Sequence, residues 1–410
     1  MSKLLVDGTY AINIVKLKDI AEKKTTKNIY GLVTETFTNS AENGIISQSD
    51  FFDRTITNDK NISGYYIVEP DDFVYNPRIS TFAPVGPINR NKLGRSGVMS
   101  PLYLVFHTHD VEPEYLEWYF KSNAWNQFMR DNGNTGARSD RFSISDAEFF
   151  NMPIPIPPVE VQKTIAKTLT TLDTKVTLEK NEVEKLQNLK SAMLTKMFPK
   201  KGKNVPKIRF DGFTDAWEQR KLGDFTELKS ALRVHKDEWT DSGVPFFRSS
   251  DVMAAINGTT NEKAYISEEL YEKLSSASGK LEKGDVLVTG GGSVGNPYIV
   301  PNNEPLYTKD ADLLWIKNQG RFHPYFLYEY FFSPTFRTYL NSISHVGTIA
   351  HYTITQLSET PICLPNIEEQ IKVGKYFDSL DHLITLHQRK YEKLIDTKKA
   401  FLVKLIGGEK

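Results

Sequence analysis

Two stretches of the chain place apolar residues at steps that alternate between three and four. This spacing is the heptad pattern of a helix that packs on another helix along a narrow seam. It predicts two long helices, near residues 159–198 and 367–406. A helix of roughly 38 residues would be about 57 Å long, and so narrow a seam needs a partner. The apolar seam positions are Ile165, Leu169, Leu172, Val176, Val183 and Leu186 in the first stretch, and Val373, Phe377, Leu380, Ile384, Tyr391 and Leu394 in the second.

The seam is continuous only if polar residues occupy some of its positions. These would be Glu179 and Lys190 in the first stretch, with His387 and Lys398 at the equivalent places in the second. Polar seam residues commonly fix the register of a coiled coil at a cost in stability. We expect the two helices to pair with each other in an antiparallel coiled coil. The alternative is that each helix packs on its own domain.

The two helical stretches are copies of one sequence. The segments that begin at Pro153 and Pro361 align without a gap over about 45 residues, with identities such as Glu160 with Glu368. Upstream of these segments the two halves still correspond, but more loosely and with loops of different length. The chain is therefore a tandem duplication in which two similar scaffolds carry different loops.

The region before each helix favours a mixed α+β structure. Strand-like apolar runs lie at residues 65–68, 102–106 and 285–289, and one aromatic-rich helix is expected in each half, near 113–128 and 324–340. We therefore predict an α+β chain of two tandem domains, joined by two long helices that form an antiparallel coiled coil with pseudo-two-fold symmetry. The predicted limits are 1–158 and 206–366 for the domains, 159–198 and 367–410 for the helical segments, and 199–205 for a basic linker.

Composition gives a mixed indication about nucleic acid. The chain has 51 Lys+Arg and 51 Asp+Glu, whereas a chain that binds DNA alone is usually basic. Local patches set the field that a phosphate feels, and residues 76–98 contain Arg and Lys but no acid. Cys363 is the only cysteine, and no apolar run approaches the roughly 18 residues of a membrane span. We therefore expect a cytoplasmic protein without a disulfide or a membrane partner.

One segment imitates a cofactor loop. Residues 290–295 fit the G-x-G-x-x-G pattern after a strand-like run, but a dinucleotide or S-adenosylmethionine loop would then open a helix. Here Asn296-Pro297 follows, which predicts a turn and another strand. The histidines lack metal-ligand spacing, so we expect no metal, no cofactor and no catalytic residue in this chain. Two alternatives stay open: a self-contained DNA methyltransferase or nuclease that uses the Gly290–Gly295 loop, and a coiled-coil scaffold without a DNA role.

The loops between strands carry hydrogen-bonding side chains mixed with glycine. Arg, Asn, Ser and His are side chains that read base edges in DNA, while Lys holds phosphates. Ordinary solvated loops have a similar composition, so any single residue is only a candidate. The candidate DNA-binding residues are Arg78, Asn89, Arg90, Lys92, Arg95, Asn134, Arg138 and Arg141 in the first half, and Arg248, Ser249, Ser293, Asn296, His345, Thr348, His351 and Tyr352 in the second.

The whole chain resembles the specificity subunits of type I restriction-modification systems. The most specific marks are the duplicated Pro-Ile-x-x-Pro-x-x-Glu-x-Gln entry to each helix and the stretches 205–224 and 347–354. The resemblance implies two target-recognition domains that each read half of a bipartite DNA site, and no catalysis in this chain. It also implies two methyltransferase subunits that modify adenine N6 and two restriction subunits that translocate and cut. S-adenosylmethionine, ATP and Mg²⁺ would be bound in those partner subunits.

Overall fold

The computed structural model describes residues 11–51, 59–135, 140–310, 312–343 and 351–407. The chain divides into two compact units. Unit 1 contains residues 1–179 and 390–410, and unit 2 contains residues 180–389. Each unit thus holds one of the predicted domains together with one end of each long helix, so its limits differ from the linear division expected from the sequence.

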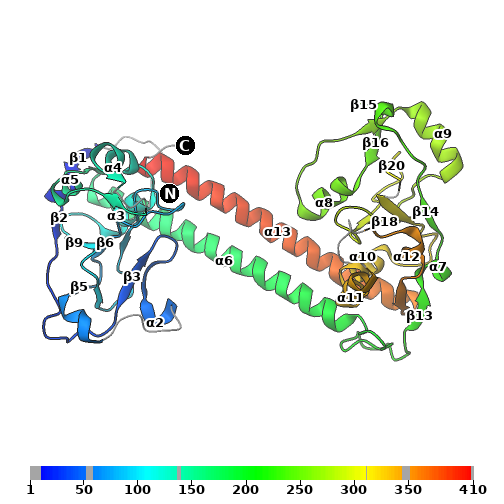
Figure 1. Cartoon of the computed structure of the whole chain (residues 1–410), viewed down its shortest axis with the longest axis horizontal. Coiled ribbons are helices and arrows are strands. Elements are labelled where there is room, and N and C mark those ends of the chain that lie inside the picture. The colour runs from blue at the N-terminus through cyan, green and yellow to red at the C-terminus, as the bar shows by residue number, and fades with distance from the viewer. Residues whose placement is uncertain (1–10, 52–58, 136–139, 311, 344–350, 408–410) are drawn as a thin grey trace. The chain divides into compact units, whose positions relative to one another are not determined.

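Unit 1 is built around a four-stranded antiparallel sheet in the order β2-β9-β6-β7 (Figure 1, blue to cyan). Phe73 of β6 stacks on Phe106 of β9 with ring centroids 5.5 Å apart, and α3 supplies the buried Trp118 and Phe120. The elements are β1 (Asn13–Lys16), η1 (Leu17–Asp19), β2 (Ala21–Lys23), β3 (Phe37–Ser40), β4 (Gly44–Ser47), α2 (Gln48–Phe51), η2 (Asp59–Gly64), β5 (Tyr66–Val68), β6 (Phe73–Tyr75), β7 (Ile88–Arg90), β8 (Gly97–Met99), β9 (Leu104–Thr108), α3 (Pro113–Lys121), α4 (Asn126–Asn132), β10 (Asn134–Thr135), β11 (Phe142–Ser143), α5 (Asp146–Phe150), β12 (Pro153–Ile156) and the first part of α6 (Val159–Met197).

Unit 2 contains a second sheet in the order β14-β21-β18-β19. β14, β21, β18 and β19 correspond in chain order and pairing to β2, β9, β6 and β7, so the duplication seen in the sequence is a duplication of topology. The elements are β13 (Glu218–Lys221), α7 (Leu222–Phe225), β14 (Leu228–Ser230), η3 (Lys236–Glu238), β15 (Trp239–Thr240), β16 (Val244–Phe247), α8 (Ser249–Asn257), β17 (Tyr265–Ile266), α9 (Glu268–Ser278), β18 (Val286–Thr289), β19 (Pro297–Ile299), β20 (Tyr307–Thr308), β21 (Leu313–Ile316), α10 (Pro324–Phe332), α11 (Pro334–Ile343), α12 (Ile354–Ser358), β22 (Pro361–Leu364) and the first part of α13 (Ile367–Ile406).

In each unit the first strand of the domain pairs with the strand that precedes the long helix. β1 pairs antiparallel with β12, with Lys16 opposite Pro153. β13 pairs in the same way with β22, with Lys221 opposite Pro361. Each domain therefore begins and ends at one two-stranded ribbon.

The prediction of a single aromatic-rich helix in each half is wrong, because two shorter helices occupy each of these places. α3 ends before Ser122 and α10 ends before Ser333, whose backbones are extended. Each serine hydroxyl donates to the carbonyl of a tyrosine three residues earlier, at 2.6 Å, which competes with continuation of the helix. The aromatic side chains of these helices are largely buried, as the sequence indicated.

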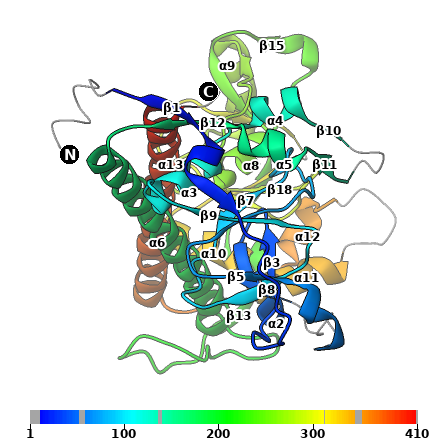
Figure 2. The same ribbon diagram turned by 90° about the vertical axis from the view of Figure 1, so that its left-hand side faces the viewer.

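The two long helices pack antiparallel within each unit. In unit 1, Asp173 of α6 pairs with Lys398 of α13 at 2.5 Å, and Glu179 pairs with Lys390 at 2.7 Å, so residue numbers rise along one helix as they fall along the other. Figures 1 and 2 show this part of α6 beside α13. In unit 2, Lys190 pairs with Asp381 at 2.6 Å and the rings of Phe198 and Phe377 are 6.2 Å apart, which gives the same sense.

The seam positions are among the less exposed residues of each helix. Ile165, Leu169, Val183, Val373, Phe377 and Leu380 are buried, and Leu172, Val176, Leu186, Ile384, Tyr391 and Leu394 are half-buried. Glu179 is also buried, which places this acid in the seam. In the part of the chain that the structure describes, no helix is long and apolar enough to cross a membrane.

Candidate nucleic-acid interface

The glycine-rich segment of unit 2 is the turn of a β-hairpin. β18 and β19 pair antiparallel on either side of residues 290–296. The Gly295 amide donates to the Thr289 carbonyl at 2.7 Å, and the Thr289 amide donates to the Asn296 carbonyl at 2.9 Å. A strand follows this turn, as the sequence predicted, whereas a dinucleotide loop would open a helix whose N-terminus holds the phosphates.

Several predicted residues of the second half meet at this turn. Ser293 is exposed at its tip and Asn296 is half-buried at its end. The Tyr352 amide donates to the Gly290 carbonyl at 2.8 Å, which brings the exposed His351 to the turn. The Ser249 hydroxyl donates at 2.9 Å to the Asp312 carbonyl, which also accepts from the Gly290 amide at 2.7 Å. We call Ser249, Ser293, Asn296 and His351 the second-domain surface.

Tyr352 itself is a core residue rather than a surface one. It is 1% exposed, and its hydroxyl is hydrogen-bonded to Thr360. Arg248 is held by Asp251 at 3.0 Å and lies 5.6 Å from the centre of the Trp239 ring, so its guanidinium is occupied within the unit. His345 and Thr348 lie outside the described residues.

The equivalent hairpin of unit 1 joins β6 to β7 through the loop at residues 76–87. Arg78 of this loop forms an antiparallel bridge with Arg141, and the Phe142 amide donates to the Pro77 carbonyl at 2.8 Å. Arg78 and Arg141 are exposed, and within the described chain neither has a carboxylate at ion-pair distance. The exposed Asn134 lies on β10, which pairs with β11 just after Arg141.

We call Arg78, Asn134 and Arg141 the first-domain surface. In both units, the segment that precedes the short helix α5 or α12 is hydrogen-bonded to the hairpin loop. The two surfaces therefore occupy corresponding places in the fold but present different side chains. Arg138, the remaining predicted arginine of this loop, lies outside the described residues.

The other predicted residues of the first half are engaged inside unit 1. Asn89 donates to the Asn39 side-chain oxygen at 2.7 Å, and Arg95 makes two 2.7 Å hydrogen bonds to Glu35. Arg90 donates to Glu117 at 2.9 Å, and Lys92 lies 3.2 Å from the same carboxylate. These four side chains stabilise the domain through carboxylate and amide partners far away in sequence.

Glu117 is a buried carboxylate whose pKa is set by the basic side chains around it. Burial by itself would raise the pKa of Glu117, but Lys121, Lys92 and Arg90 more than offset this effect, and the pKa lies below its usual value. The carboxylate is therefore ionised at neutral pH. Asn89, Arg90 and Lys92 line a groove of about 590 Å³ that also includes Trp118 and Lys398.

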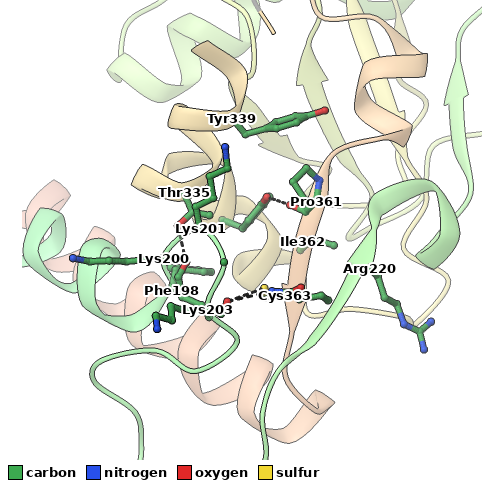
Figure 3. A pocket seen from close by; sticks show the side chains of 14 residues that line it. Phe198, Lys200, Lys201, Lys203, Arg220, Thr335, Tyr339, Pro361, Ile362 and Cys363 are labelled. Atoms are coloured by element: carbon green, nitrogen blue, oxygen red, sulfur yellow. Dashed lines mark hydrogen bonds between the residues drawn. The ribbon is translucent and has the colours of Figure 1, made fainter. Parts of the chain in front are cut away.

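The basic linker contacts unit 2 through its backbone, while residues 200–205 are exposed. The Pro199 carbonyl accepts from the Thr335 hydroxyl at 2.6 Å, and Phe198 is 3% exposed against the aromatic residues of α10. A cavity of about 240 Å³ lies between the linker turn and Pro361–Cys363 (Figure 3). Figure 3 shows the Lys200 and Arg220 side chains extending away from Ile362 and Cys363.

The single thiol of the chain lines this cavity. Burial raises the pKa of Cys363, and its sulfur lies 3.7 Å from the Lys203 carbonyl, to which it donates. A thiol whose pKa is raised is a poor nucleophile at neutral pH. The described residues include no group of three or more His, Cys, Asp or Glu side chains that could hold a metal ion.

One residue of the hairpin region could not be recognised from the sequence. Arg337 of α11 donates at 3.0 Å to the Asn296 side-chain oxygen, beneath the turn of unit 2. It lies in an aromatic helix whose pattern indicated only core packing. The contact depends on the fold, which brings α11 under the hairpin.

Comparison with protein families decides the class of this chain. The model of the type I restriction modification DNA specificity domain matches residues 11–188 and again residues 214–395. The chain belongs to this specificity family. It therefore carries two tandem recognition domains, and the resemblance found in the sequence is confirmed.

Individual members of the specificity family are distant from this chain in sequence. The type I restriction enzyme MjaVIII specificity subunit of Methanocaldococcus jannaschii is 26% identical over 332 residues, which are 77% of this chain and 75% of the relative. A putative type I specificity subunit of Haemophilus influenzae, S.HindORF215P, is 27% identical over 255 residues, 60% of each chain. Among solved structures, the S subunit of a type I restriction-modification system from M. genitalium matches with a TM-score of 0.58 at 12% identity, covering 98% of both chains. This last likeness shows a shared fold.

Proposed function

We propose that this specificity-family chain selects a bipartite DNA target, with each recognition domain reading one half through its hairpin surface. The observation that carries the proposal is the repeated sheet order, which presents different side chains at the same place in each unit. Two copies of one scaffold that carry different exposed loops are expected of a protein that binds two different DNA half-sites. Arg78 and Arg141 supply charge for phosphates or guanine, and Ser293 and Asn296 supply hydrogen bonds to base edges.

We propose that α6 and α13 form one antiparallel coiled coil that joins the two recognition domains. The support is that equivalent residues make equivalent pairs in the two units. Lys190 pairs with Asp381 in unit 2, and the matching lysine and aspartate of the repeat, Lys398 and Asp173, pair in unit 1. Charged pairs of this kind specify one register of two helices.

We propose that two methyltransferase subunits bind these helices. Leu178 of α6 is 63% exposed, and its repeat equivalent Leu386 of α13 is 54% exposed. Leu178 follows the seam position Val176 by two residues, a rotation of about 200° around the helix, so it lies on the side away from the seam. Other exposed positions nearby have diverged between the halves, for example Thr174 and His382, whereas Thr177 and Leu178 are both retained as Thr385 and Leu386. Retention of this exposed pair at both sites fits a partner that binds twice.

We propose no catalysis in this chain itself. Two restriction subunits would complete the complex, and S-adenosylmethionine, ATP and Mg²⁺ would be bound by the partner subunits. The alternative of a self-contained methyltransferase requires cofactor binding at residues 290–295. Calorimetry of the isolated chain with S-adenosylmethionine tests it, since binding would support that alternative. A coiled-coil scaffold without a DNA role predicts that changes in the recognition domains alter no DNA motif.

The decisive experiment is a genome-wide map of N6-methyladenine in host cells that lack this gene and carry variants on a plasmid. The unchanged chain should restore one two-part motif. The double variant R78A/R141A should alter only one half of this motif, and S293A/H351A only the other half. K163A, on the exposed start of α6, serves as the matched surface control and should leave the motif intact. A methylome that does not depend on this gene would refute the proposal.

A further inference from the structure

Arg337 lies on α11 directly beneath the hairpin turn of unit 2. Its guanidinium donates to the Val294 carbonyl at 3.4 Å and to the Asn296 side-chain oxygen at 3.0 Å. The turn lies close against this helix, because a Cβ on Gly295 would approach Leu340 Cδ2 to 2.6 Å. Gly295 also has a φ of +74°, which favours glycine. The hairpin turn and α11 therefore form one packed body.

The positive charge of Arg337 has no local counter-charge. The guanidinium lies 5.4 Å from the centre of the Phe332 ring and 5.8 Å from that of Phe336. Among the described residues, no carboxylate lies within ion-pair distance of it, and burial lowers its pKa from the usual value. An arginine nevertheless stays protonated at any physiological pH. A permanent cation therefore supports the turn from below.

Arg337 also fixes which way the Asn296 amide faces. The Asn296 oxygen accepts from Arg337, and its nitrogen donates to the Ser293 carbonyl at 2.8 Å. The reversed amide would point its nitrogen at the guanidinium, and two donors would then face each other. One N–H and one oxygen lone pair of the amide remain for a ligand. A side-by-side donor and acceptor of an amide is the arrangement that pairs with adenine N7 and N6 in the major groove.

The equivalent position of unit 1 holds a different residue. Phe336 packs edge-on against Phe331, with ring centroids 4.7 Å apart, and Trp125 packs in the same way against Phe120, with ring centroids 5.8 Å apart. The residue after Trp125 is Asn126, which therefore corresponds to Arg337. In unit 1 a cavity of about 220 Å³, lined by Asn126, lies below the hairpin loop. The support beneath the hairpin thus differs between the two domains.

We propose that Arg337 is a positioning residue that sets base choice in the second recognition domain. It holds the side-chain amide of Asn296 in the orientation that can form two hydrogen bonds with an adenine. This inference rests on the proposed function, because it assumes that the second-domain surface contacts DNA. The inference names Arg337, which lies outside that surface, as a determinant of specificity, and it assigns an adenine to one position of the half-site.

The test uses the chain assembled with its methyltransferase subunits and a DNA library randomised over the two half-sites. R337A should lower the preference for adenine at one position of one half-site by about tenfold to a hundredfold, the range of a good bidentate contact. The other half-site should not change. R337Q, which can still donate to Asn296 but has no charge, should keep part of that preference. R321A removes an exposed arginine that donates to the Phe225 carbonyl at 3.1 Å and serves as the control.

A second variant distinguishes orientation from a general effect on folding. N296A should relax the same base position as R337A, since both remove the oriented amide. Relaxation at different positions, an unchanged adenine preference in R337A, or an equal loss at both half-sites would each overturn the inference. A complex of the unchanged chain that methylates no two-part motif would instead refute the proposed function.

Discussion

Replacement of Glu329 by Gln should stabilise unit 2 at alkaline pH and have little effect at acidic pH. Lys190 lies 2.6 Å from Asp381 and 2.9 Å from Glu329, so one cation serves two carboxylates. Asp381 receives two hydrogen bonds from Lys190 and is partly exposed. The Glu329 side chain is fully buried, and neither of its oxygens has a well-aligned hydrogen bond in the described structure. The lysine charge is therefore already balanced by Asp381.

The sign of the pH effect follows from this arrangement. Burial raises the pKa of Glu329 to about 8, and Asp381 adds to the increase while Lys190 opposes it. The folded chain then keeps a proton that the unfolded chain releases near its ordinary pKa of 4.5. Stability is full below that ordinary value and falls as the pH rises towards about 8. At about 1.4 kcal/mol per pH unit, the loss is up to about 5 kcal/mol above pH 8.

The assay is urea unfolding of the full chain between pH 5.0 and 8.5, followed by circular dichroism. Hydrogen exchange of the α10 peptide, corrected for intrinsic rates, reports the local stability around Glu329. E329Q should match the unchanged chain near pH 5 and exceed it by a few kcal/mol at pH 8. E368Q, at the exposed start of α13, serves as the control. If E329Q and the unchanged chain lose stability in parallel over this range, Glu329 does not keep its proton and the reasoning is wrong.

Three further predictions concern the seam and the hairpin. K190M should cost about 1–2 kcal/mol, because Asp381, which is 28% exposed, loses its partner while Glu329 stays protonated. K398M should cost at most about 1 kcal/mol, because Asp173 is 40% exposed; urea unfolding of both variants compares them. L172K combined with L380K should abolish co-purification with the methyltransferase while both recognition domains stay folded by circular dichroism, and stoichiometric co-purification would contradict the coiled coil. G295A should cost about 1–3 kcal/mol, because alanine is strained at a φ of +74° and its Cβ would approach Leu340 Cδ2 to 2.6 Å. Thermal unfolding measures this cost, and an unchanged midpoint would contradict both the backbone conformation and the packing of the turn on α11.

The long helices were the most predictable part of the fold. Their heptad spacing is a local pattern repeated over many turns, so even a polar residue such as Glu179 could be placed in the seam from its spacing alone. The strands are between two and five residues long, and their pairings join distant segments. The parallel pairing of β16 with β20, for example, brings Phe246 beside Tyr307. So short a run carries too little periodicity to reveal its partner.

The candidate site was predictable as a set of loops but not residue by residue. Residue type and loop context singled out Arg78 and Arg95 equally. The fold leaves Arg78 exposed beside Arg141, whereas Arg95 is paired with Glu35, which is 60 residues away in sequence. Tyr352 stands in a polar run and is nevertheless buried, because its hydroxyl has an internal partner in Thr360. These outcomes depend on tertiary neighbours that spacing along the chain does not encode.

The ribbon at which each domain begins and ends has a consequence for how such a chain can change over time. Asn13 faces Ile156 across β1 and β12, and Glu218 faces Leu364 across β13 and β22, so the chain enters and leaves each domain at neighbouring points. A gene segment exchanged between these points would insert a foreign domain without moving the helix that follows it. The segments that encode the two helices are matched in sequence within one gene. Recombination at these segments therefore gives new pairs of recognition domains in one step, each with an intact helical scaffold.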